Sequence, residues 1–251
     1  MNEHLPVDKT FKLFIGGAFP RSESGRTFAV RDAKGALLAN ASQASRKDLR
    51  EAVRAARGAQ ESWAGRTAYN RGQILYRAAE MMEARRPEFV SVLRQIGVTP
   101  KAASKQVDQA IDRWVWYAGW ADKTHHILGT VNPVAGPYFN FTFPEPTGVV
   151  GVMAPDEPAL LGLVSRLAAV IVSGNTAVAV VEGPASLAAI TLAEVLATSD
   201  LPGGVVNLLT GDKNELLPWM MGHLDINAVD LTGAPEDLDP TILEEAAVNV
   251  K

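Results

Sequence analysis

TGVVGVM (residues 147–153) begins the stretch of sequence that decides the fold, because from here short apolar runs alternate with longer apolar segments. Further runs follow at residues 176–181, 205–209 and 226–231. They are almost continuously apolar rather than alternating, which is typical of strands buried on both faces of a parallel sheet. The stretch therefore predicts a parallel sheet covered by helices on both sides.

The segments between these runs are expected to be the covering helices. They are predicted at residues 160–172, 186–199, 214–223 and 236–247. Gly174 follows the first of them, in the position where a left-handed glycine commonly ends a helix. Because strand–helix–strand crossovers are right-handed, the predicted fold class is α/β with a Rossmann-like, doubly wound parallel sheet.

The first 136 residues differ from this pattern and are expected to pack on the core as strands and helices. Residues 11–40 read as antiparallel strands joined by turns. Ser45 and Asp48 resemble a capping box at the start of the first helix. The helices of this part are predicted at residues 45–63, 67–86, 88–96 and 100–118.

Composition excludes several classes of partner and of site. The chain has 251 residues without a cysteine, and its four histidines show no ligand spacing, so we expect neither a disulfide nor a metal site. Its net charge of −4, with both signs mixed, argues against nucleic acid or an anionic membrane as a partner. No signal peptide is visible, and no run approaches the roughly 18 to 20 apolar residues that span a bilayer. We expect a cytoplasmic protein.

Four short motifs resemble landmarks of the aldehyde dehydrogenase superfamily, in the same order and at its spacing. They are YAGWADK at 117–123, EPTGVVG at 145–151, SGNT at 173–176 and LPGGVVN at 201–207. The resemblance implies the cofactor-binding half of such an enzyme, without the catalytic domain that carries the nucleophilic cysteine. It divides the chain into an N-terminal part (1–136), a β-arm for oligomerisation (137–147) and a dinucleotide-binding-type core (148–251).

This chain departs from the family at the positions that the resemblance implies for chemistry and for adenosine binding. The family follows Pro155 with a Trp and then an Asn that helps to bind the oxyanion, whereas this chain has Glu157 in place of the Asn. A carboxylate cannot donate a hydrogen bond to an oxyanion. Val180 and Gly183 replace a lysine and a glutamate that bind the ribose. Glu182 is adjacent to the second position and is expected to face elsewhere.

A further departure lies where the family holds the pyrophosphate at a helix N-terminus. Gly233 matches the family motif, but Pro235 removes a backbone donor. Glu236 and Asp237 are expected at the positive end of the following helix, where they favour the helix and oppose a phosphate. We therefore interpret Pro155, Glu157, Val180, Gly183 and Gly233 as vestigial positions and expect no catalytic residue and no bound cofactor.

These observations predict a non-catalytic member of the superfamily that serves as an accessory subunit of an active aldehyde dehydrogenase. The chain resembles the shortened, cysteine-free second module of aldehyde dehydrogenase family 16 proteins. Two alternatives remain open. The chain is half of a split NAD-dependent aldehyde oxidoreductase completed by a partner chain, or it is a degenerate nucleotide-sensing module.

The expected partner is an active dehydrogenase subunit, or a second copy of this chain, bound through the β-arm. Phe139, Phe141 and Phe143 alternate along the arm, so that a strand here has one strongly apolar face. Either this face packs on the chain's own helices or it pairs with another subunit. We expect the second, because an unpaired apolar edge is a feature that soluble proteins avoid.

Overall fold

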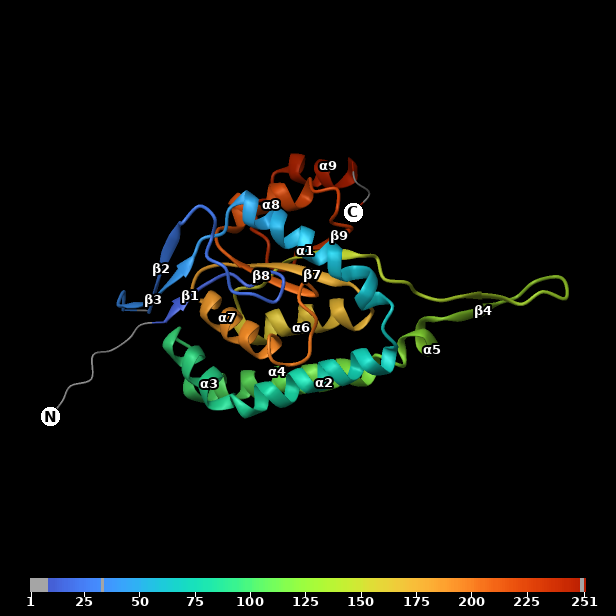
Figure 1. The fold of residues 1–251 in the computed structure, drawn as a ribbon, viewed down its shortest axis with the longest axis horizontal. Coiled ribbons are helices and arrows are strands. Elements are labelled where there is room, and N and C mark those ends of the chain that lie inside the picture. The colour runs from blue at the N-terminus through green and yellow to red at the C-terminus, as the bar shows by residue number, and fades with distance from the viewer. Residues whose placement is uncertain (1–8, 33, 249–250) are drawn as a thin grey trace.

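The computed structural model describes residues 9–32, 34–248 and 251, and its core is a parallel β-sheet (Figure 1). The strands are β6 (Val149–Met153), β7 (Thr176–Val181), β8 (Val206–Thr210) and β9 (Ala228–Asp230). Within the described residues their order is β8-β7-β6-β9, and each neighbouring pair is parallel. Every residue of β6, β7 and β8 is buried, as their continuous apolar runs predict. The predicted α/β fold class is confirmed.

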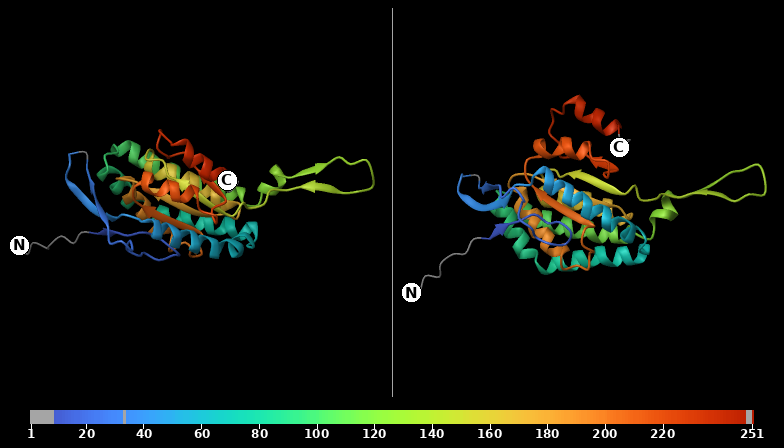
Figure 2. Two further views of the ribbon diagram at one scale, coloured as in Figure 1. Left: turned by 90° about the horizontal axis from the view of Figure 1, so that it is seen from above. Right: turned by 45° about the horizontal axis from the view of Figure 1, so that its top comes forward.

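Helices cover both faces of this sheet (Figures 1 and 2). On one face lie α6 (Ala159–Val172) and α7 (Ala185–Leu196). On the other face lie α1 (Arg46–Ala64), α8 (Lys213–Met221) and α9 (Pro240–Val248). The side chains between the sheet and its helices form two apolar clusters, one on each face. The chain thus builds the layers that a doubly wound sheet requires.

A second layer of helices packs against α6 and α7 on the side away from the sheet (Figure 1). It consists of α2 (Ala68–Ala84), α3 (Arg86–Gln95) and α4 (Pro100–Trp120). The indole of Trp114 lies fully buried at the centre of this layer. The predicted second helix, α2, ends before Pro87, as expected. The next helix, α3, begins one residue ahead of that proline.

The capping box predicted at the start of α1 is confirmed. Asp48 Oδ2 accepts a hydrogen bond from the Ser45 backbone N–H at 2.8 Å, and Ser45 Oγ accepts one from the Asp48 N–H at 3.3 Å. Asp48 also accepts hydrogen bonds from the Ser22 hydroxyl and the Glu23 N–H, so the same carboxylate fixes the preceding loop. One buried acid thereby joins the N-terminal sheet to α1.

The N-terminal strands form a small sheet in the order β1-β3-β2. β2 (Thr27–Arg31) and β3 (Leu37–Ser42) are antiparallel, as predicted, but β1 (Thr10–Phe11) is parallel to β3, which the sequence pattern did not predict. The physical reason lies in the turn after β1. Gly16 and Gly17 have φ values of 62° and 82° and reverse the chain tightly, and the Gly16 N–H donates to Asn207 Oδ1 on β8. This turn attaches the segment to β8 instead of joining β1 to β2 as a hairpin.

A hairpin projects from the body of the molecule in all views (Figures 1 and 2). It follows the short helix α5 (Thr124–Leu128) and pairs β4 (Thr130–Asn132) with β5 (Asn140–Thr142) in antiparallel register. β5 lies within the predicted arm, whereas its partner β4 precedes residue 137 and was not anticipated. Phe139, Phe141 and Phe143 are 75%, 52% and 46% exposed, and the Phe143 ring lies 5.6 Å from the His125 ring of α5. The apolar face therefore contacts one of the chain's own helices at Phe143 and is largely exposed elsewhere.

Candidate functional site

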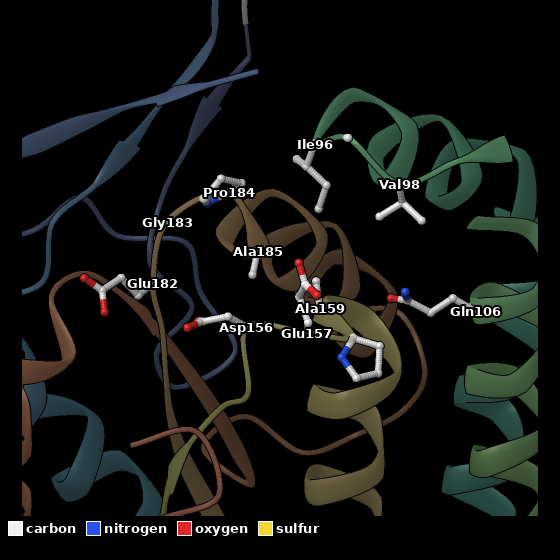
Figure 3. Close-up of a pocket in the computed structure, with 12 residues that line it drawn as sticks. Ile96, Val98, Gln106, Asp156, Glu157, Ala159, Glu182, Gly183, Pro184 and Ala185 are labelled. Carbon is white, nitrogen blue, oxygen red and sulfur yellow. The ribbon is translucent and has the colours of Figure 1, made fainter. Parts of the chain in front are cut away.

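A cavity of about 770 Å³ opens at the carboxyl ends of β6 and β7, which is where ligands bind in open α/β sheets (Figure 3). One wall consists of the β6–α6 loop and the end of β7. The opposite wall consists of the loop after α3, with Ile96 and Val98, and of Gln106 on α4. Gln106 Oε1 accepts the backbone N–H of Leu160 at 2.9 Å, so it occupies a donor at the start of α6.

Three carboxylates line this cavity: Asp156 and Glu157 before α6, and Glu182 after β7 (Figure 3). The Glu182 carboxylate is turned toward the start of α8, where its Oε2 lies 3.5 Å from the backbone N of Lys213. That Glu182 faces away from the ribose position stays a prediction. Burial raises the pKa of Glu182, the charges of Asp212 and Asp156 raise it further, and the contact with Lys213 opposes the shift.

Lys213 is a functional candidate that the sequence analysis missed. Its side chain is 3% exposed, and its Nζ donates to Asp156 Oδ1 at 2.7 Å, whereas the Asp156 side chain is 66% exposed. The ammonium thus lies behind the cavity wall and its charge is paired. No local signal pointed to this contact, because the two residues are 57 positions apart, Asp156 in the β6–α6 loop and Lys213 at the start of α8.

The positions interpreted as vestigial do not all meet in the cavity. Glu157 and Gly183 line it, and Gly183 contributes only backbone there, with φ 58°. Val180 is fully buried in the apolar cluster under α1 and α8, so it faces the interior of the protein. Pro155 packs on α6 at Gly162, where an added Cβ would lie 2.5 Å from its Cγ.

Gly233 has a packing role that explains its presence. Its N–H donates to the Met153 carbonyl at 3.0 Å, and a Cβ at this position would lie 2.2 Å from the Ala154 carbonyl oxygen. The backbone after β9 therefore closes directly against the carboxyl end of β6. A side chain of any size would separate these two segments.

The segment after Gly233 corrects the prediction of a helix over 236–247. α9 begins at Pro240, and Asp239 Oδ1 accepts the Thr241 N–H at 2.9 Å. An acidic cap followed by proline in the first turn is a stronger start signal than Pro235 provides. Glu236 and Asp237 consequently precede the helix and do not occupy its positive end.

The sequence and the fold resemble those of a known enzyme family. A family model described as "Aldehyde dehydrogenase family" matches residues 19–251. This chain belongs to the aldehyde dehydrogenase family. It is 32% identical to DhaS of Bacillus subtilis (strain 168) over 96% of this chain and 49% of that protein. It is also 32% identical to human retinal dehydrogenase 2 over 91% of this chain and 45% of that protein.

Solved structures of aldehyde dehydrogenases have the same fold. The NAD+ complex of aldehyde dehydrogenase from Bacillus cereus matches with a TM-score of 0.88 at 28% identity, covering 97% of this chain and 50% of that one. This chain therefore spans about half the length of these relatives. The superfamily resemblance drawn from the four motifs is confirmed.

A dinucleotide is the cofactor that this aldehyde dehydrogenase fold implies. The segment that the resemblance assigns to its pyrophosphate, residues 233–237, is not part of the cavity lining, and the residues that do line the cavity do not fit a phosphate group. Their polar side chains are three carboxylates and Gln106, whose amide oxygen accepts the Leu160 N–H and whose amide NH₂ is an uncharged donor. The ammonium of Lys213 is paired with Asp156. Phosphate binding requires free N–H donors and positive potential, and this site instead presents negative charge.

In the part of this aldehyde dehydrogenase chain that the structure describes, no group of three or more His, Asp and Glu side chains is arranged to hold a metal ion. Over the same residues, no helix combines the length and the apolar character needed to cross a bilayer. The carboxyl-end cavity and the projecting hairpin therefore remain the two features on which a function can be argued.

Proposed function

We propose that this aldehyde dehydrogenase family chain is a non-catalytic accessory subunit that docks through its β-arm on an active aldehyde dehydrogenase. The observation that carries the proposal is the exposed aromatic hairpin. Its role would be that of the shortened second module in aldehyde dehydrogenase family 16 proteins, supplied by a separate polypeptide. In the absence of a dehydrogenase partner, the same hairpin would pair two copies of this chain.

The chemistry of the hairpin supports docking on a protein. Residues 127–144 contain no charged side chain, and Val131 and Tyr138 are exposed beside the three phenylalanines. The rings of Phe139 and Phe141 are tilted against each other with centroids 5.3 Å apart, and those of Phe141 and Phe143 are stacked at 5.7 Å. Within the described residues, β4 and β5 pair only with each other, so both outer edges of the hairpin are free. Free edges and an apolar face are what β-strand addition uses.

The absence of catalysis is supported by the residues themselves. The family's nucleophile is a cysteine, and this chain contains none. Glu157 occupies the position at which the family has an oxyanion-binding Asn, and its negative charge would oppose the charge that develops there. For a working site, another chain would have to supply both the cysteine and the group that binds the oxyanion.

The test replaces the aromatic face of the arm. The variant Phe139→Ser, Phe141→Ser, Phe143→Ser should be monomeric by multi-angle light scattering, whereas the wild-type chain should form a stable complex with an aldehyde dehydrogenase purified from the same organism, or a homodimer. A control with Tyr69→Ser, Tyr76→Ser and Trp116→Ser removes equally exposed rings from α2 and α4 and should still associate. A wild-type chain that is monomeric at high concentration and binds none of the dehydrogenases would contradict the proposal.

A split oxidoreductase is the second candidate, and the chain matches about half the length of these relatives. In this reading, the cysteine and the general-base glutamate come from a partner chain that resembles the unmatched half. Mixing the two chains should then produce NADH from an aldehyde. If this chain is instead an accessory subunit, the turnover of its dehydrogenase partner should depend on the cofactor site of that partner. Substituting Glu157→Asn would raise turnover only in the split enzyme.

A further inference from the structure

We propose that the cavity at the carboxyl ends of β6 and β7 excludes phosphate-bearing nucleotides by its negative charge, so that this chain folds and docks without one. The proposal concerns the cavity walls and does not depend on docking through the arm. It goes beyond the loss of family contacts, because it assigns an active role to side chains that occupy the cavity.

The first observation is the number of acids along this edge of the sheet. Asp156, Glu157 and Glu182 line the main cavity (Figure 3). Glu182 also lines a neighbouring hollow of about 230 Å³, together with Asp212 at the start of α8. A ligand lying across the ends of β6, β7 and β8 would therefore pass four carboxylates. Like charges placed together repel each other and suppress binding of the wrong partner.

The second observation is the position of the positive charge. Among the described residues, the cation in contact with these acids is Lys213, and its hydrogen bond goes to Asp156. Because its side chain is almost completely buried, the ammonium cannot turn toward a ligand without breaking that ion pair. The cavity thus presents the remaining acids to solvent with no compensating cation at its surface.

The third observation concerns the helix N-termini that face the cavity. α6 and α7 begin after Pro158 and Pro184, and neither proline has a backbone N–H. The Leu160 N–H in the first turn of α6 is bonded to Gln106. The donors that make a helix start attractive to phosphate are therefore partly missing and partly occupied.

Two explanations of the weak nucleotide binding that we expect make different predictions. If binding is weak only because favourable contacts have been lost, removing the acids changes nothing. If the acids exclude the ligand, neutralising them should increase affinity for phosphate-bearing ligands but not for an uncharged nucleoside. The double variant Glu157→Gln, Glu182→Gln distinguishes them, and it leaves the Lys213–Asp156 ion pair intact.

The experiment measures binding of ADP and of adenosine by titration calorimetry at about pH 8, where carboxyls are ionised. We expect ADP to bind the double variant at least about tenfold more tightly than the wild type, with adenosine unchanged. The matched control, Glu51→Gln with Glu80→Gln, neutralises two exposed helix acids and should behave as the wild type. Far-UV circular dichroism and the midpoint of urea unfolding verify that each variant is folded.

Two results would overturn the inference. One is a wild-type chain that binds ADP or NAD with a micromolar dissociation constant. The other is a folded double variant whose affinity for ADP is no greater than that of the wild type, which would leave lost contacts as the explanation. Loss of association in the arm variant would affect neither result, so the two proposals fail independently.

Discussion

Glu194 on α7 holds two other parts of the molecule through ion pairs. Its carboxylate lies 2.6 Å from Lys9 Nζ and 2.5 Å from Arg85 Nη2, which belongs to the junction of α2 and α3. Burial by itself would raise the pKa of Glu194, but the hydrogen bonds and charges of Lys9 and Arg85 outweigh it and hold the pKa below the ordinary value. The ionised form is therefore favoured in the folded protein.

Glu194→Gln should lower the free energy of unfolding by about 1 kcal/mol at neutral pH. A depressed carboxyl pKa stabilises the fold above the unfolded value near 4.5, and this contribution is lost as the pH falls through the folded pKa. The difference between wild type and variant in urea unfolding should thus be largest at pH 7 and vanish in acid. Glu80→Gln, which removes an exposed pair with Arg77, should cost less than about 0.5 kcal/mol at any pH. A pH-independent loss in Glu194→Gln would contradict this account.

Arg71 is a buried cation that stabilises helix ends through backbone carbonyls. Its guanidinium donates to the carbonyls of Val172, Ala64 and Arg66, at 3.0, 3.2 and 2.6 Å. Val172 and Ala64 end α6 and α1, where positive charge is favourable, and Arg66 lies in the loop between α1 and α2. Burial lowers the pKa of Arg71, but an arginine keeps its proton at neutral pH.

Arg71→Met should destabilise the protein by about 2 to 4 kcal/mol, because it leaves three carbonyls without their donor. The measurement is the free energy of unfolding in urea, with Arg77→Met on the exposed face of α2 as the matched control. A loss no greater than that of the control would show that the carbonyls find other donors.

At the scale of elements, the end of α6 depends on one glycine. Gly174 has a φ of 96°, and a Cβ there would lie 2.9 Å from Pro146 Cγ and 3.2 Å from the Cα of Ala64. Both the left-handed backbone and the close approach of α1 require glycine. Gly58, inside α1, differs in both respects, because a Cβ there would meet nothing within 4 Å.

The two glycines should respond to alanine with opposite signs. Gly174→Ala should destabilise the fold by about 1 to 3 kcal/mol, whereas Gly58→Ala should stabilise it by about 0.5 to 1 kcal/mol. Thermal unfolding of the two variants beside the wild type provides the measurement. Equal signs would mean that α6 ends by a different mechanism from the one described.

At the scale of the whole molecule, the chain has the fold of about half of an aldehyde dehydrogenase and contains no cysteine. We expect that the purified chain does not reduce NAD or NADP with any common aldehyde, because no thiolate is available to form the covalent intermediate. The assay follows absorbance of the reduced cofactor, with an active aldehyde dehydrogenase as the positive control. Turnover that survives removal of contaminating dehydrogenases, or covalent capture of an aldehyde by this chain, would refute the expectation.

The sequence by itself determined the parts of the molecule that local chemistry specifies. The continuous apolar runs fixed β6, β7 and β8, because a strand buried on both faces tolerates few polar residues. Ser45 and Asp48 set the start of α1 through bonds within one turn, and Gly174 set the end of α6. Two helix-start signals lie before or at the start of α9, at Pro235 and at Pro240. The sequence pattern predicted the first, whereas the helix begins at the second.

Only the tertiary structure decided the contacts between distant segments. Lys213 meets Asp156 because the carboxyl ends of parallel strands converge at one edge of the sheet, and Glu182 joins them once β7 has ended. β1 runs parallel to β3 because the Gly16–Gly17 turn attaches to β8, more than 190 positions further along the chain. Such contacts depend on how the layers of the fold are arranged in space, and local sequence periodicity does not predict that arrangement.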